Sequence, residues 1–206
     1  MHQTRQQTTT RIPIPRKGTK YIARSRGSKK NSVSVVTALR DILKIASRAS
    51  EVKKMIHEKL LKINGKQVKD LHEPIYLFNI LSADKNYVLK VNESKKFFFE
   101  VASLESERLC KVVNKRLLKE GDIQLNLHDG SNIISNEKVV VGDSVHLDFS
   151  SKIKKVSKIE KGKKVFIYRG KYEGKIGTIN EIKGSLITLS INNHSASINK
   201  KQVIAL

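Results

Sequence analysis

The sequence is poor in cysteine, tryptophan and long apolar runs. Cys110 is its one cysteine among 206 residues, so no disulfide can form within the chain, which is typical of a reducing intracellular compartment. Its longest apolar stretches, such as residues 97–99 and 139–141, hold three or four residues, far fewer than the ~20 that span a bilayer. With no tryptophan and 38% hydrophobic residues, we expect several small cores and no membrane partner.

Acidic residues are missing from the first part of the chain. The first 40 residues contain ten lysines or arginines, and the first acid is Asp41. The whole chain holds 41 basic and 19 acidic residues, which gives a formal net charge of +22. Because this excess persists even if every acid is paired within the fold, it indicates a polyanionic partner, and a nucleic acid backbone is the usual one.

Residues 1–35 are predicted to form an extended basic arm. Pro13 and Pro15 favour an extended backbone and prevent a continuous helix, while residues 24–32 are polar and basic, with little apolar surface to bury. Two interpretations stay open, a solvated disordered tail and an arm ordered by RNA, and the prolines and Tyr21 favour the second. Our candidate RNA-binding residues here are Arg5, Arg11, Arg16, Lys17, Lys20, Tyr21, Arg24, Arg26, Lys29 and Lys30.

Residues 36–85 combine a helical pattern with a hairpin signal. Apolar residues recur at helical spacing over 36–46 and again over 52–56, on either side of a break at 47–50 that offers two serine N-caps. Asn64-Gly65 lies between short alternating runs and predicts a tight hairpin turn. We expect two helices packed on a small hairpin sheet, with a basic surface formed by Arg40, Lys44, Arg48, Lys53, Lys54, Lys62 and Lys66.

After Pro74 the sequence predicts mainly strands. Asp129-Gly130 follows an alternating run and gives a second hairpin signal. Seven lysines and one acid between residues 152 and 164 indicate a basic connection, after which short strands and frequent glycines predict a small barrel. The strand candidates are residues 75–81, 87–91, 97–101, 123–128, 165–168, 175–182, 186–191 and 197–204, and residues 139–147 supply a further turn and strand. The candidate RNA-binding residues of this part are Arg169, Lys171 and Lys175.

Four segments, in the right order, carry a resemblance to a known family. They are residues 13–21, residues 39–66, residues 109–132 with the string Gln124-Leu125-Asn126-Leu127-His128-Asp129-Gly130-Ser131-Asn132, and residues 165–179. Together they resemble the archaeal and eukaryotic small-subunit ribosomal protein four, the e-type family. The string is the specific part of the resemblance, because the helix pair and the KOW-like segment at 165–179 each occur in several families.

The resemblance implies a multi-module α+β protein. Its modules would be an extended basic N-terminal arm at 1–35, an alpha-L type RNA-binding domain at 36–85, a central β domain at 86–158 and an SH3-like KOW barrel at 159–206. It also implies a structural constituent of the small ribosomal subunit, bound to ribosomal RNA and neighbouring ribosomal proteins in the cytoplasm. Two alternatives stay open, a KOW-containing transcription-elongation factor and an RNA-modification accessory protein.

Catalytic, metal and cofactor sites are not expected. Cys110 has no CxxC partner and is predicted to be a small buried residue, and the six histidines lack zinc-ligand spacing. The turn explains Asp129, and no matched nucleophile accompanies it. Residues 170–176 differ from a phosphate-binding loop, since three residues separate the glycines and Ile replaces Ser or Thr. We therefore expect no enzyme activity, metal, cofactor or small-molecule substrate.

The run Phe97-Phe98-Phe99 allows two interpretations. Alternate residues of a strand lie on opposite faces of its sheet, so the run could pack a core with one ring exposed, or present a platform on which bases stack. The first interpretation is favoured.

Overall fold

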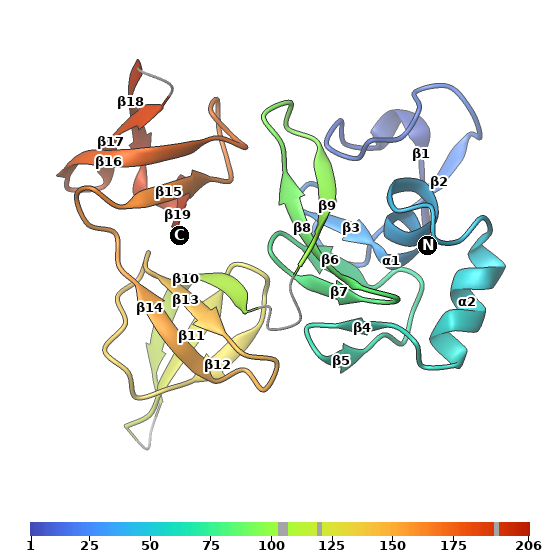
Figure 1. Ribbon diagram of the computed structural model, residues 1–206, viewed down its shortest axis with the longest axis horizontal. Coiled ribbons are helices and arrows are strands. Elements are labelled where there is room, and N and C mark those ends of the chain that lie inside the picture. Colours follow the sequence, from blue (N-terminus) through green and yellow to red (C-terminus); the bar gives the residue numbers. More distant parts are fainter. Residues whose placement is uncertain (103–106, 119–120, 192–193) are drawn as a thin grey trace. The chain divides into compact units, whose positions relative to one another are not determined.

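The computed structural model describes residues 1–102, 107–118, 121–191 and 194–206 (Figure 1). Helices are few, so the protein is mostly β rather than an even α+β mixture, and its strands form several separate sheets. The chain divides into two compact units, residues 1–106 and residues 107–206. We call them the N-terminal unit and the C-terminal unit and describe each by itself.

The first 35 residues contribute short strands to the N-terminal unit. Ile12, Ile22 and Val33 are buried, so apolar contacts fix this segment to the rest of the unit. The many basic residues beside them make these apolar positions hard to recognise in the sequence. The backbone N–H of Phe97 donates to the carbonyl of Arg11 at 2.7 Å. The strands are β1 (His2–Thr4), paired with β2 (Tyr21–Ala23), and β3 (Ser32–Ser34), paired with β6 (Pro74–Tyr76); a 3-10 turn, η1 (Arg5–Gln7), follows β1.

The helical pattern of the sequence gives two short helical segments. The first consists of α1 (Val35–Thr37) and a π-helical turn, η2 (Ala38–Ile42), and the second is α2 (Ala49–His57). Neither serine of the break caps α2: Arg48 holds the N-cap position, and the Glu51 carboxylate accepts the backbone N–H groups of Ser47 at 2.7 Å and Arg48 at 3.4 Å. Among the described residues, no helix has the length and apolar character needed to cross a bilayer.

A five-stranded antiparallel sheet completes the N-terminal unit, and Figure 1 shows its β8–β9 hairpin in green. Asn64 and Gly65 both have positive φ, at 51° and 79°, which confirms the hairpin turn. The strand expected over residues 75–81 is interrupted at Phe78, whose φ of 62° breaks the extended backbone. The order is β5 (Lys66–Gln67), β4 (Lys62–Ile63), β7 (Ile80–Ser82), β8 (Asn86–Val91) and β9 (Phe97–Val101).

The phenylalanine run lies in β9 and is more buried than expected. Phe97 is 2% exposed and belongs to the core, while Phe98 and Phe99 are both half-buried. Phe98 pairs with Lys90, and Phe99 pairs with Leu89, on the neighbouring strand β8. No ring of this run is therefore exposed as a stacking platform.

The first sheet of the C-terminal unit packs its core from alternate residues of its strands. Cys110, Val112, Leu125 and Leu147 are essentially buried, which confirms the prediction for the cysteine. The basic connection expected over 152–164 is in part a strand, because β14 lies within it. The order is β12 (Asn132–Ile134), β11 (Ile123–Leu127), β10 (Arg108–Leu117), β13 (Ser144–Leu147) and β14 (Ile153–Ser157).

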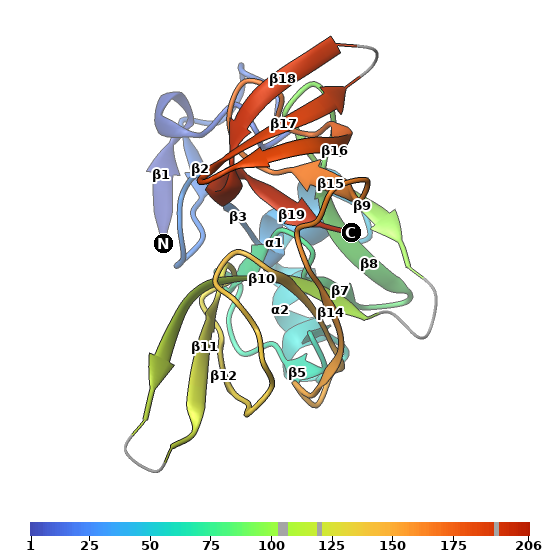
Figure 2. The same ribbon diagram turned by 90° about the vertical axis from the view of Figure 1, so that its left-hand side faces the viewer.

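The second sheet of the C-terminal unit has the last strand returning to its first (Figure 2). Its order is β18 (His194–Asn199), β17 (Leu186–Ile191), β16 (Ile176–Lys183), β15 (Lys164–Ile167) and β19 (Val203–Ala205), with a 3-10 turn, η3 (Lys200–Gln202), before β19. The two sheets are hydrogen-bonded to each other, since the backbone N–H of Ala205 donates to the Ser144 hydroxyl at 2.8 Å. The Lys111 ammonium donates to the carbonyls of Lys200, at 2.6 Å, and of Val203.

Candidate nucleic-acid interface

The N-terminal segment presents an exposed tyrosine beside basic groups at the start of β2. Tyr21 is 51% exposed. Its ring lies edge-on to His2, with centroids 4.9 Å apart, and the Lys20 ammonium lies 5.5 Å from its centroid. An aromatic face beside cations is suited to stacking a base next to a phosphate. The other exposed basic candidates of this segment are Arg16, Lys17, Arg26, Lys29 and Lys30.

Several basic candidates of the same segment already bind groups of the protein. The Arg5 guanidinium donates to the Thr19 carbonyl at 2.7 Å and the Thr19 hydroxyl at 2.9 Å, and also to the Pro15 carbonyl. Arg11 donates to the Lys30 carbonyl at 3.1 Å and to the Asn31 side chain at 3.0 Å. Arg5 therefore closes the loop between β1 and β2, whereas Arg11 ties this loop to the residues just before β3. Both arginines shape the surface on which the other cations lie.

Arg24 and Arg26 differ in their surroundings. Arg26 is exposed and forms an ion pair with Asp70. Arg24 is half-buried, and its Nε atom is closed off from solvent without a hydrogen-bond partner among the described residues. The fold therefore brings only part of the expected set to an open surface.

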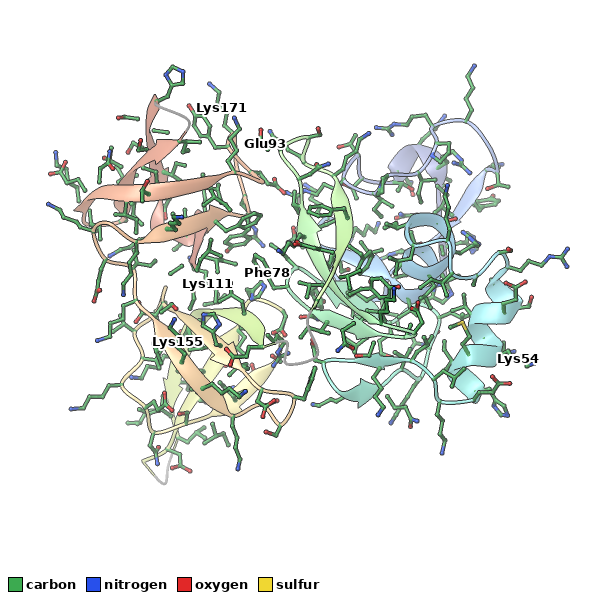
Figure 3. All side chains as sticks on the ribbon, viewed as in Figure 1. Lys54, Phe78, Glu93, Lys111, Lys155 and Lys171 are labelled. Carbon is green, nitrogen blue, oxygen red and sulfur yellow. The ribbon has the colours of Figure 1, made fainter. Side chains whose placement is uncertain are left out.

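The helical region shows the same division. Arg40 donates two hydrogen bonds to its neighbour Asp41, at 2.9 and 2.8 Å, and this hydrogen bonding raises the pKa of Arg40. Lys54, which projects from α2 in Figure 3, lies 3.8 Å from the carboxylate of Glu58. The remaining candidates, Lys44, Arg48, Lys53, Lys62 and Lys66, are all exposed.

In the C-terminal unit, the three expected residues lie around the loop after β15. Arg169 and Lys171 are exposed, and Lys175 is half-buried. The Arg169 guanidinium lies 5.3 Å from the ring centroid of Tyr168, and the Lys171 ammonium lies 5.7 Å from that of Tyr172. Two of the three cations are thus held beside an aromatic ring.

Sequence reasoning missed a cleft between the two sheets of this unit. Its volume is about 770 Å³, and Tyr168, His128, Lys111, Lys200 and Lys201 line it together with Arg169. Burial, with a smaller contribution from the nearby charge of Arg169, lowers the pKa of Lys111 to about 8. The adjacency of Tyr168 to Arg169 was a visible signal, but nothing local in the sequence relates it to His128.

The polar residues around the hairpin turn at Asp129 have a structural role. Asp129 forms a buried ion pair with Arg108, at 2.6 Å, besides its place in the turn. Burial raises the pKa of the Cys110 thiol, which makes it a poor nucleophile. Among the described residues, no group of three histidine, cysteine, aspartate or glutamate side chains is arranged to hold a metal ion.

Known proteins with similar sequences and structures point to one family. The model of ribosomal family S4e matches residues 83–153. The small ribosomal subunit protein eS4 of Methanocella arvoryzae is 35% identical over 178 residues, which cover 83% of this chain and 76% of that protein. The protein of the same name from Archaeoglobus fulgidus is 29% identical over 189 residues, covering 89% and 80%.

A solved structure shares the fold. The crystal structure of the 30S ribosomal protein S4e from Thermoplasma acidophilum matches with a TM-score of 0.73 and 25% sequence identity. The match covers 85% of this chain and 95% of that chain.

Proposed function

The chain belongs to ribosomal family S4e, and from this premise we propose that it is a structural constituent of the small ribosomal subunit, acting in translation. The observation that carries the proposal is the 35% identity over 83% of the chain to a protein named small ribosomal subunit protein eS4. The role is structural rather than enzymatic. Its place is on ribosomes in the cytoplasm, and its partners are the small-subunit ribosomal RNA and neighbouring ribosomal proteins.

The relatives give no support to the alternatives. A transcription-elongation factor or an RNA-modification accessory protein would share single segments with this chain, whereas the relatives named eS4 match most of its length.

We further propose that the chain is built from the four modules expected from its sequence. These are the basic arm at 1–35, the alpha-L type domain at 36–85, the central β domain at 86–158 and the KOW barrel at 159–206. The turn at Asn64-Gly65 and the meandering order of the last sheet support the second and fourth. The boundary at residue 86 lies between β7 and β8, which are hydrogen-bonded neighbours, so these two modules share a sheet.

RNA contact in this proposal falls to the exposed cations. An exposed lysine or arginine without an acid partner can bind a phosphate without first breaking an ion pair inside the protein, and each such contact releases counterions. Arg26, Arg40 and Lys54 would have to leave acid partners. The proposed phosphate-binding set is Arg16, Lys17, Lys20, Lys29, Lys30, Lys44, Arg48, Lys53, Lys62, Lys66, Arg169 and Lys171, with Tyr21 as a stacking residue.

The experiment that tests this function is co-sedimentation of the tagged chain with the small subunit. We expect the chain in the subunit fraction, and we expect its affinity for free small-subunit RNA to fall with salt, with a slope of roughly −0.7 to −0.9 per phosphate contacted. Replacing Lys17 and Lys20 by glutamine should reduce that slope by about two contacts' worth, whereas Lys85→Gln, at an exposed lysine outside the proposed set, should leave it unchanged. A chain found only in ribosome-free fractions contradicts the proposal.

A further inference from the structure

The cleft in the C-terminal unit combines two aromatic rings with a fixed geometry; we call it the Tyr168 cleft. The rings of Tyr168 and His128 lie edge-on, with centroids 6.3 Å apart and planes at 66°. The Tyr168 hydroxyl donates to the Lys201 carbonyl at 2.7 Å. The backbone N–H of Lys111 donates to Nδ1 of His128 at 3.1 Å. Both rings are therefore positioned before any ligand arrives, which reduces the cost of binding.

The lining of the Tyr168 cleft is positively charged. It includes Lys111, Arg169, Lys200 and Lys201, and none of its lining residues, all of which the structure describes, is an aspartate or glutamate. Lys111 is 3% exposed and donates to the carbonyls of Lys200 in η3 and Val203 in β19, so it links the two sheets and adds a cation to the cleft lining. Asp143, close enough to raise the pKa of Lys111, is buried outside the lining. The open part of the cleft thus keeps a cationic surplus.

Aromatic faces beside cations match the chemistry of a nucleotide. A base can stack on a tyrosine or histidine ring, and the attached phosphates can pair with lysine and arginine. Arg169 is exposed and lies over the Tyr168 ring, so its guanidinium can move to a phosphate when a base takes its place. The volume of about 770 Å³ is within the usual range of small-ligand sites, roughly 300–1,000 Å³. An acidic peptide would use the cations but not the rings.

We propose that the Tyr168 cleft binds one unpaired nucleotide of a single-stranded RNA segment, with its base stacked against Tyr168 and its phosphates paired with Arg169 and Lys201. The inference rests on the proposed ribosomal function and makes it more specific, because the exposed cations elsewhere bind phosphates of any RNA helix. A base within a duplex is stacked between its neighbours and cannot enter such a cleft.

The test uses the full chain with two fluorescent probes, a single-stranded hexa-adenosine RNA and a mixed-sequence RNA duplex. Binding is measured by fluorescence anisotropy, and ultraviolet cross-links to the single strand are mapped by mass spectrometry. In the wild-type chain we expect a cross-link at Tyr168. Tyr168→Leu should weaken binding of the single strand about tenfold or more, in line with the loss of one stacked base, and should leave duplex binding within about twofold.

Matched variants separate stacking from structure. Tyr168→Phe keeps the ring and loses the hydrogen bond to Lys201, so its affinity should stay within about twofold of wild type. Arg169→Gln, at an exposed position, should lower the salt slope of single-strand binding by about 0.7. Lys164→Gln, at an exposed lysine outside the lining, should leave the cross-link at Tyr168 in place. If Tyr168→Leu fails to fold, Arg169→Gln and the wild-type cross-link decide the question.

Two outcomes overturn the inference. One is single-strand affinity within twofold of wild type in a folded Tyr168→Leu chain, and the other is a wild-type cross-link map without Tyr168. If the wild-type chain still co-sediments with the small subunit in either case, the cleft proposal fails while the ribosomal function stands. If the wild-type chain does not co-sediment, the ribosomal function fails, and the cross-link map still reports on the cleft.

Discussion

The buried ion pair between Arg108 and Asp129 gives a sharp prediction about stability. One carboxylate oxygen of Asp129 accepts from the Arg108 guanidinium at 2.6 Å, and the two side chains are only 3% and 7% exposed. The other oxygen accepts from the Ser131 backbone N–H at 3.0 Å and hydroxyl at 2.6 Å. Asp129→Asn keeps the size of the side chain and removes its charge, which leaves the guanidinium buried without a counter-charge.

The expected loss is about 3–5 kcal/mol, the usual result of removing one partner of a buried pair. We expect a loss in the upper part of that range, because Nε of Arg108 has no hydrogen-bond partner among the described residues. The pairing with Asp129 therefore provides most of the energy that offsets the burial of the guanidinium charge. A domain of this size is stable by only about 5–15 kcal/mol. The substitution should therefore remove a large fraction of the stability of the C-terminal unit.

Urea unfolding, read by amide hydrogen exchange at Leu125 and Leu127 in β11, measures this loss. The control is Glu137→Gln, at an exposed acid of the same unit, which should change the stability by no more than about 0.5 kcal/mol. The double variant Arg108→Met with Asp129→Asn should lose less free energy of unfolding than the two single variants lose together, because no unpaired charge stays buried in it. A loss below about 1 kcal/mol in Asp129→Asn, or strict additivity, refutes the reasoning.

Three further substitutions or modifications test other parts of the structure. Because the folded pKa of Lys111 is lowered to about 8 from 10.5, the unfolded chain binds more protons between these values. Wild type should therefore gain about 2 kcal/mol of unfolding free energy relative to Lys111→Met between pH 7 and 9.5 in urea titrations, and parallel pH profiles would contradict this. Gly27→Ala places a Cβ against the Tyr76 hydroxyl and 2.9 Å from Pro74 Cβ, so the N-terminal unit should lose about 1–3 kcal/mol; an unchanged thermal midpoint would count against that packing. Cys110 should resist a thiol reagent at pH 8 until urea unfolds the chain, since burial raises its pKa, and labelling of the native chain as fast as free cysteine would show an open site.

Local chemistry in the sequence was sufficient for several features. Asn64-Gly65 forms the turn that its residue types favour, because both residues adopt positive φ. Cys110 lies in the core as a small apolar residue does. The surplus of basic over acidic residues is a property of composition alone, and the string at 124–132 falls within the segment that matches the S4e family. Each of these depends on neighbouring residues or on totals, which the sequence states directly.

Three-dimensional packing decided the rest. The Tyr168 cleft joins residues 111, 128, 168 and 201, and the ion pair joins Arg108 to Asp129 across 21 positions. The local sequence pattern also could not predict which cations stay exposed, since Arg5 donates to Thr19 whereas Lys17 is exposed to solvent. Charge and residue spacing can be read directly along the chain. The hydrogen-bond and ion-pair partners of a side chain depend instead on how distant strands pack against one another, because that packing determines which groups are buried and which are hydrogen-bonded.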